Sequence, residues 1–223
     1  WRPRVGEFVD SLTKGQRTEN EKIAFLDVPN DRKIYMRLVT RGNNPDLILF
    51  NTQKMSQQLE RYFHLDSYCI EVVTEKTHSI MANPNVCELI VPASYSPVFE
   101  GSPTKFKARA LQYALETSPA RNDDWIVHLD EETLFDDAFL VHLVSQMKEH
   151  RHSRIIFQGL IRYLPNSFES KWHFICTLAD SLRVTDDLSR FRLQFEWGKC
   201  WFGIKGSFIV LQNHTEKEIG FNY

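Results

Sequence analysis

The sequence predicts an α/β fold built around a largely parallel sheet. Short apolar runs rich in β-branched residues alternate along the chain with longer amphipathic stretches, a pattern typical of strands connected by helices. A length of 223 residues with 42% hydrophobic content is enough to bury one substantial core. Residues 1–32 are polar and lack a sustained period, so we expect an irregular lead-in followed by one domain over residues 33–223.

The first half of that domain alternates strands with a helix. A β-rich run at residues 34–40 ends in a turn-forming segment with Gly42 and Pro45, and an amphipathic stretch follows at residues 45–63. Two more strands are expected at residues 68–74 and 88–92.

The second half continues the alternation. Ser102 and Pro103 predict a helix start, with serine as the N-cap and proline in the first turn, and this helix should reach about Glu116. A compact apolar strand at residues 125–129 leads to Thr133, which is expected to cap the next helix. The remaining elements are expected as a helix at 134–149, strands at 155–163 and 207–211, and a long helix at about 171–189.

Composition and charge exclude several classes of protein. A net charge of −2 and a pI near 6.5 provide no global field for attracting nucleic acid, so no nucleic-acid partner is expected. No stretch approaches the run of about 18 apolar residues that crosses a bilayer, so no transmembrane segment is expected within this chain. The chain starts with Trp1 rather than Met, which suggests an interrupted sequence.

The cysteines favour reduced thiols. The four residues are widely spaced and form no CxxC pair, so neither a zinc site nor a disulfide framework is indicated. Reduced, buried cysteines are typical of a compartment that faces the cytosol. They are Cys69, Cys87, Cys176 and Cys200.

Polar residues follow three predicted strands at the point where each ends. In open α/β sheets, ligands collect outside the carboxyl ends of the strands. We therefore expect Thr40 and Arg41, Glu75, and the acidic run of residues 130–132 to meet at one edge of the sheet.

The acidic run predicts a metal site. Three adjacent carboxylates repel one another unless a cation shares the site. Asp130 and Glu132 can point to the same side if the backbone stays extended, and Mg²⁺ or Mn²⁺ typically takes one or two carboxylates plus the oxygens of a substrate diphosphate. The alternative, a solvated loop ahead of a helix that favours acids at its start, stays open.

Basic residues crowd the start of the helix expected after Ser102. Lys105, Lys107 and Arg109 lie where the helix dipole already favours an anion, so a phosphate group would relieve their repulsion. A basic, solvated helix face is the alternative. Acids that hold a metal beside bases that hold a diphosphate together indicate a nucleotide-diphosphate substrate. His128, within an apolar strand, is expected to be a core residue.

The sequence around the acidic run resembles egghead-type β-1,4-mannosyltransferases, a group of family 2 inverting glycosyltransferases. The signature is the run from Asp124 to Thr133, preceded by the run from Lys107 to Leu111. Other similar segments are residues 72–76, 158–161, 178–183 and 205–208.

The resemblance implies a GT-A, Rossmann-like fold, with residues 33–223 as part of a glycosyltransferase catalytic domain. It further implies GDP-mannose as donor, a divalent metal and a glucosylceramide-like acceptor at a membrane surface, as in glycosphingolipid biosynthesis. Asp130 and Glu132 match the family's Asp-x-Asp motif, which meets the metal and diphosphate, while Glu75 matches its first, nucleoside-binding acid, usually an aspartate. The implied nucleotide-sugar-binding residues are Thr40, Arg41, Glu75, Lys107, Arg109 and Asp130, and those on the acceptor side are Lys205, Gly206 and Ser207.

The resemblance also implies that the chain is truncated at its C-terminal end. The family's Glu-Asp motif, which supplies the catalytic base, and its later Gln-x-x-Arg-Trp-like motif are not in this sequence. We expect the base and the membrane segments beyond Tyr223, so that this chain alone is inactive. The full-length protein is expected at the endoplasmic reticulum or Golgi membrane with its catalytic domain facing the cytosol.

Two other functions stay open from the sequence. One is a nucleotide-sugar-binding module on the same scaffold that lacks a base. The other is a metal-dependent nucleotidyltransferase, which usually carries a Gly-rich phosphate loop near its first strand, whereas residues 41–44 contain a single glycine.

Overall fold

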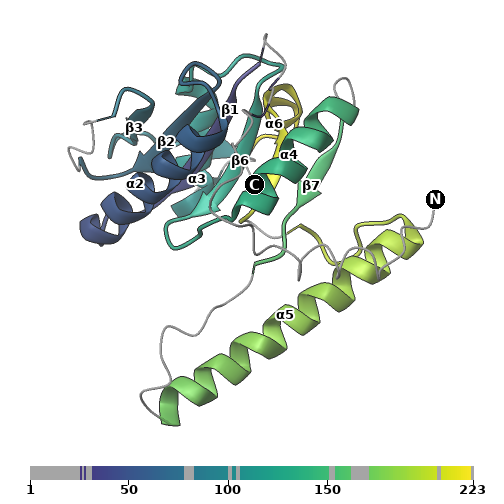
Figure 1. The fold of residues 1–223 in the computed structure, drawn as a ribbon. Helices are drawn as coiled ribbons and strands as arrows, with labels where there is room; N and C mark the ends of the chain where they lie inside the picture. Colours follow the sequence, from purple (N-terminus) through teal and green to yellow (C-terminus); the bar gives the residue numbers. More distant parts are fainter. Residues whose placement is uncertain are drawn as a thin grey trace.

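The computed structural model describes most of the domain expected after the lead-in. The described residues are Leu26, Val28, 32–77, 83–99, 102–103, 106–150, 154–161, 171–204 and 207–221. A six-stranded sheet lies between two layers of helices (Figure 1), and four neighbouring strands of it run parallel. The predicted α/β class and mostly parallel sheet are confirmed, and they are consistent with a GT-A-like fold.

The strand order of the large sheet is β3-β2-β1-β6-β8-β7. Only β8 runs against its neighbours: it pairs antiparallel with both β6 and β7. The bounds are β1 Ile34–Val39, β2 Tyr68–Thr74, β3 Val86–Ile90, β6 Trp125–Asp130, β7 Ile156–Gln158 and β8 Ile209–Gln212, and a separate two-stranded sheet joins β4 Val98–Phe99 to β5 Ser102–Pro103.

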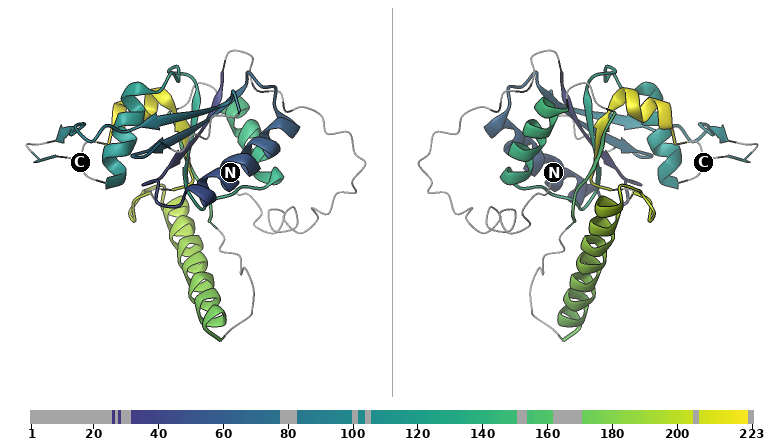
Figure 2. Two further views of the ribbon diagram at one scale, coloured as in Figure 1. Left: turned by 90° about the vertical axis from the view of Figure 1, so that its left-hand side faces the viewer. Right: turned by 90° about the vertical axis from the view of Figure 1, so that its right-hand side faces the viewer.

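Helices cover both faces of the sheet. The two views in Figure 2 place α2 and α4 on one face and α3 and α6 on the other, while α5 extends away from the sheet. The bounds are α2 Pro45–Tyr62, α3 Phe106–Thr117, α4 Asp137–Glu149, α5 Lys171–Trp197 and α6 Asn213–Ile219. None of the helices in the described ranges combines the length and the apolar content that a bilayer crossing requires.

Two predicted helix starts are wrong. Ser102 and Pro103 form β5, and α3 begins only at Phe106, because the residues before it pair with β4. Thr133 does not cap α4; its N–H donates to the Asp130 carbonyl at 2.9 Å, and Asp136 caps the helix by accepting from the Phe139 N–H at 2.9 Å. Local hydrogen bonding of the loop thus delays both helices by a few residues.

Other boundaries shift as well. The strand expected at residues 155–163 is limited to β7, Ile156–Gln158, and α5 extends to Trp197 instead of ending near residue 189.

The two faces of the sheet are packed differently. On the face covered by α2 and α4, alternate residues of β1 and β6 join one apolar core with both helices. Its central members are Ile34, Met36, Leu38, Trp125, Val127 and Leu129 from the strands, with Ile48, Met55 and Leu59 from α2 and Leu140, Leu143 and Met147 from α4. The opposite face holds two smaller apolar clusters, one around Val39, Val73 and Leu111 and one around Tyr35, Ile126 and Leu211.

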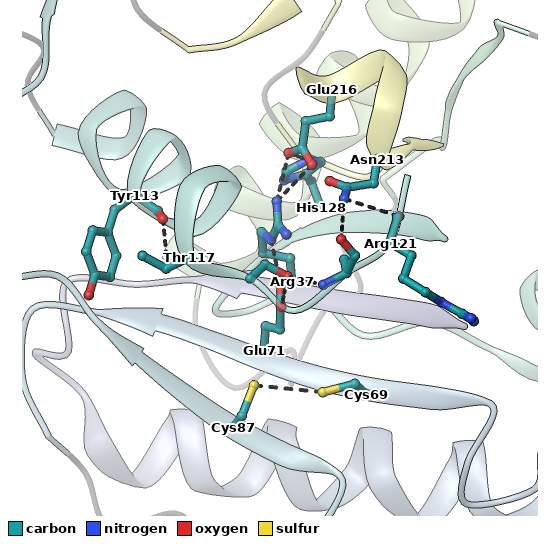
Figure 3. A network of polar contacts seen from close by, with 12 residues as sticks. Arg37, Cys69, Glu71, Cys87, Tyr113, Thr117, Arg121, His128, Asn213 and Glu216 are labelled. Atoms are coloured by element: carbon teal, nitrogen blue, oxygen red, sulfur yellow. Dashed lines mark hydrogen bonds and ion pairs between the residues drawn. The ribbon is translucent and has the colours of Figure 1, made fainter. Parts of the chain in front are cut away.

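A buried polar network lies on the face that α3 and α6 cover (Figure 3). Arg37 on β1 stands directly between Glu71 on β2 and His128 on β6 in the register of the sheet. Its Nε donates to Glu71 Oε2 at 2.7 Å, and its Nη1 donates to both carboxylate oxygens of Glu216 at 2.8 and 2.9 Å. His128 Nε2 lies 2.7 Å from Glu216 Oε1. His128 is buried as predicted, but among ionic groups rather than apolar ones.

Opposite charges keep Arg37 and Glu216 ionised in spite of their burial. Burial alone would raise the pKa of Glu216, but the charges of His128 and Arg37 lower it below its usual value. Burial likewise disfavours the charged guanidinium of Arg37, yet Glu216 and Glu71 hold its pKa above the usual value. The network therefore ties three strands to α6 through charges that cannot be removed singly.

The thiols of β2 and β3 also lie on this face. Cys69, Cys87 and Cys200 are free, and the Sγ atoms of Cys69 and Cys87 are 3.8 Å apart. The Cys176 side chain lies outside the described residues.

Replacing the central cation tests the network. Arg37→Met should lower the free energy of unfolding by about 3–5 kcal/mol, because Glu71 and Glu216 would be buried without their cation. Arg154→Met is the control, since Arg154 is exposed and pairs with Glu218 at 3.0 Å; its loss should stay below about 1 kcal/mol. Urea unfolding of both variants measures the difference.

The pH dependence gives this test a second readout. Because the pKa of Glu216 is lowered in the fold, its contribution in the wild type is complete above the ordinary value of 4.5 and declines as the pH falls toward the lowered pKa. In Arg37→Met, protonation instead relieves the two buried carboxylates that have lost the guanidinium, so the gap in the free energy of unfolding between variant and wild type should narrow in acid. A gap that stays constant with pH would contradict this account.

Candidate functional site

The carboxyl ends of β1, β2 and β6 meet at one edge of the sheet. Val39 stands opposite both Val73 and Asp130 in the register, and the Thr40 N–H donates to the Val73 carbonyl at 2.9 Å. The polar residues that follow these strands therefore gather at this edge, as expected. We call this edge, formed by Thr40, Glu75, Asp130, Glu131 and Glu132, the acidic rim.

Two bases of α3 pair with acids of the acidic rim. The Lys107 amine contacts the Asp130 carboxylate, and about a third of each side chain is exposed, 36% and 35%. Arg109 Nη1 lies 2.7 Å from Glu75 Oε1, while its other nitrogens donate to the carbonyls of Tyr95 and Pro92 at 2.9 and 3.1 Å. The predicted bases and acids thus lie side by side. Lys105 lies outside the described residues.

The acidic run turns immediately after β6. The bond from the Thr133 N–H to the Asp130 carbonyl closes a four-residue turn. The backbone therefore does not stay extended, which is the condition under which Asp130 and Glu132 would point to the same side. Glu131 folds back and accepts a hydrogen bond from the Thr40 hydroxyl, and the Asn51 amide of α2 donates to the Glu131 carbonyl. Glu132 is exposed, as is Arg41.

Asn51 and the role of Glu131 are not among the site residues that the sequence predicts. Asn51 is almost fully buried in an amphipathic helix, and a buried amide needs a partner. Its position on the apolar face of α2 was the available signal.

The carboxylates of the acidic rim fit a hard divalent cation that a substrate also ligates. Within the described ranges, no three His, Cys, Asp or Glu side chains are grouped so that they could hold a metal by themselves. Mg²⁺ and Mn²⁺ do not require such a group, because one or two carboxylates plus phosphate oxygens suffice. Asp130 and the exposed Glu132 supply oxygen donors of this kind. Without a bound cation, the Lys107 ammonium pairs with the Asp130 carboxylate.

Several known enzymes have sequences similar to this chain. The chain is 37% identical over 193 residues to the β-1,4-mannosyltransferase egh of Drosophila melanogaster and 36% identical over 195 residues to the β-1,4-mannosyltransferases bre-3 of Caenorhabditis briggsae and Caenorhabditis elegans. The resemblance to egghead-type β-1,4-mannosyltransferases is confirmed. Each match covers 85% of this chain but 40% of the relative, so the chain spans less than half the length of these glycosyltransferases. No family model and no solved structure matches the chain.

Of the three residues that the sequence resemblance leads us to expect on the acceptor side, the structure describes Ser207. Lys205 and Gly206 lie outside the described residues. Ser207 is buried, and its Oγ finds no hydrogen-bond partner among the residues that the structure describes. Its carbonyl accepts from Gln158 Nε2 at 2.8 Å.

Removal of the Ser207 hydroxyl should affect the free energy of unfolding differently from removal of a hydrogen-bonded hydroxyl. Ser207→Ala should leave the free energy of unfolding unchanged or raise it, because no hydrogen bond is lost and a buried polar atom is removed. Ser118→Ala is the matched control: its hydroxyl donates to the buried carboxylate of Glu71, so it should cost about 1–3 kcal/mol. Thermal unfolding compares them, and an equal loss in both variants would assign Ser207 a structural hydrogen bond.

Proposed function

We propose that the protein carrying this chain transfers mannose from GDP-mannose to a glucosylceramide-like glycolipid with inversion, forming a β-1,4 linkage in glycosphingolipid biosynthesis. The supporting observation is the 36–37% identity, over 85% of this chain, to enzymes named β-1,4-mannosyltransferases. The acids of the acidic rim and the bases of α3 that pair with them suit the donor half of such a site, which needs groups that bind a nucleotide diphosphate.

The donor half of the proposed site is built from the acidic rim and α3. Asp130 and Glu132 would hold Mg²⁺ or Mn²⁺, which would stabilise the negative charge of the leaving diphosphate. Lys107 reaches Asp130 now and has a flexible, partly exposed side chain, so it can exchange that carboxylate for a phosphate. Glu75, oriented by Arg109, would contact the nucleoside, and Thr40 and Arg41 complete this edge.

The acceptor half is only partly within this chain. Lys205, Gly206 and Ser207 are assigned to its near side. An inverting transfer needs a base that takes the proton from the acceptor hydroxyl as that oxygen attacks the anomeric carbon. We place that base in a part of the full-length protein outside this chain, together with the segments that associate it with the endoplasmic reticulum or Golgi membrane.

The first test measures transfer and metal-dependent binding together. The full-length protein should move radiolabelled mannose from GDP-mannose to glucosylceramide in detergent. Asp130→Asn should abolish this transfer and weaken Mn²⁺-dependent GDP binding at least tenfold, because one anionic ligand is lost. Asp66→Asn, an exposed aspartate before β2 at the opposite edge of the sheet, is the control. Equal GDP affinities in the two variants, measured by calorimetry, would contradict the metal assignment.

A second test separates phosphate binding from folding. Lys107→Ala should reduce the affinity for GDP about tenfold and leave the affinity for guanosine almost unchanged, since the ammonium has no phosphate to meet in the nucleoside. Calorimetric titrations with the two ligands give the comparison. Parallel losses for GDP and guanosine would mean that Lys107 supports the fold through Asp130 rather than the diphosphate.

A further inference from the structure

Phe208 holds a backbone conformation that bulky side chains rarely adopt. Its φ is 57°, and among the described residues no other non-glycine residue has a positive φ. A conformation of this kind costs on the order of 1–3 kcal/mol and persists only where the surroundings over-determine it, which happens most often at functional sites.

Contacts on both sides of Phe208 impose this conformation. Its N–H donates to the His128 carbonyl, and its carbonyl accepts from the Gly159 N–H, both at 2.7 Å. Its ring lies against Gly159 so closely that a Cβ there would be 1.6 Å from the ring. Any residue other than glycine at position 159 would displace the ring. The glycine directly after β7 therefore leaves the space that the Phe208 ring occupies.

Gln158 fixes the direction of the chain at the turn. Its Nε2 donates to the Ser207 carbonyl at 2.8 Å and lies 3.2 Å from the Phe208 carbonyl. One carboxamide therefore orients two successive peptide groups.

The turn lies beside the acidic rim. Ile209 pairs with His128, which is two residues before Asp130, and β8 runs antiparallel to β6. The residues before Ile209 therefore continue toward the edge at which β6 ends in Asp130. Ser207 leads to this edge, and its buried hydroxyl has no hydrogen-bond partner among the residues that the structure describes.

We propose that Gln158 is a positioning residue for sugar transfer, because its carboxamide fixes the Ser207–Phe208 turn next to Asp130 and so sets where the acceptor sugar meets the donor. This rests on the proposed function. A displacement of about 1 Å at a reacting centre can lower the rate about 100-fold, so a single hydrogen bond that fixes a turn has a large effect on transfer. The residues assigned to the donor lie instead on α3, at the end of β6 and in the segments that follow β1 and β2, so donor affinity should not depend on Gln158.

The experiment uses the full-length protein and two variants. Gln158→Glu keeps the shape of the side chain but turns a carboxylate toward two carbonyl oxygens, and Gln158→Met removes the donor without adding charge. Both should lower kcat/KM for the glycolipid acceptor at least tenfold and leave the Kd for GDP within about twofold. Gln57→Glu, the same change on the exposed face of α2, should leave both values unchanged.

Each outcome decides the proposal. Variants with wild-type kcat/KM, variants that lose GDP affinity and turnover to the same extent, or unfolding of both variants would overturn it and leave Gln158 with a structural role at most. A wild-type protein that transfers no mannose would overturn the proposed function and this inference with it. Active wild-type protein with unaffected variants would overturn the inference alone.

Discussion

The fold depends on one constraint, the polar rung that Glu71, Arg37 and His128 form across the centre of the sheet. Arg37 is fully buried, so it must remain paired wherever it lies. Because side chains alternate between the faces of a strand, a slip of β1 by one residue would turn Arg37 away from Glu71 and Glu216 and into the apolar core under α2 and α4. The observed register of β1 is therefore far more stable than the registers shifted by one residue. Glu216 extends this specificity to α6, which is bound to the same guanidinium.

The rung also fixes the edge at which the acidic rim forms. Two residues beyond Arg37 and His128, Val39 and Asp130 remain in register, so the strand ends are level. Ion pairs at the two places differ in exposure, and this decides what each can do. The Lys107–Asp130 pair is partly solvated and contributes about 0–1 kcal/mol, so a phosphate or a cation can replace either partner at little cost. The Arg37–Glu216 pair cannot exchange partners without leaving a buried charge unpaired. It therefore stays fixed and holds the strands whose ends form the acidic rim.

The periodicity of the hydrophobic residues and the polar residues at the strand ends were sufficient to predict much of this arrangement. The apolar run ending at Leu129 placed the acidic residues at a strand terminus, and the neighbouring strands brought Thr40 and Glu75 to the same edge. The start of α3 was not predictable in this way, because Pro103 is compatible with both a helix start and a short strand. The start of α4 was not predictable either, because Thr133 and Asp136 are both residue types that cap helices. The polar rung is not evident from the strands taken one at a time, although each of them carries an acidic or basic residue within an apolar run, at Arg37, Glu71 and His128. Their pairing depends on register and on Glu216, which is 179 positions from Arg37, and neither is visible in local sequence.

The reversed strand explains why late residues of the chain can reach the acidic rim. The parallel strands β1, β2 and β6 deliver to this edge only the residues that follow them. A strand that runs the opposite way delivers the residues that precede it, and β8 is the strand of the large sheet that does so. The chain must therefore turn sharply into β8 beside Asp130, and it does so at Phe208 with a left-handed residue. Because Gln158 at the end of β7 and Gly159 directly after it accommodate that turn, the edge strand of the sheet controls a segment that adjoins the acidic rim, although no residue of β7 belongs to the rim.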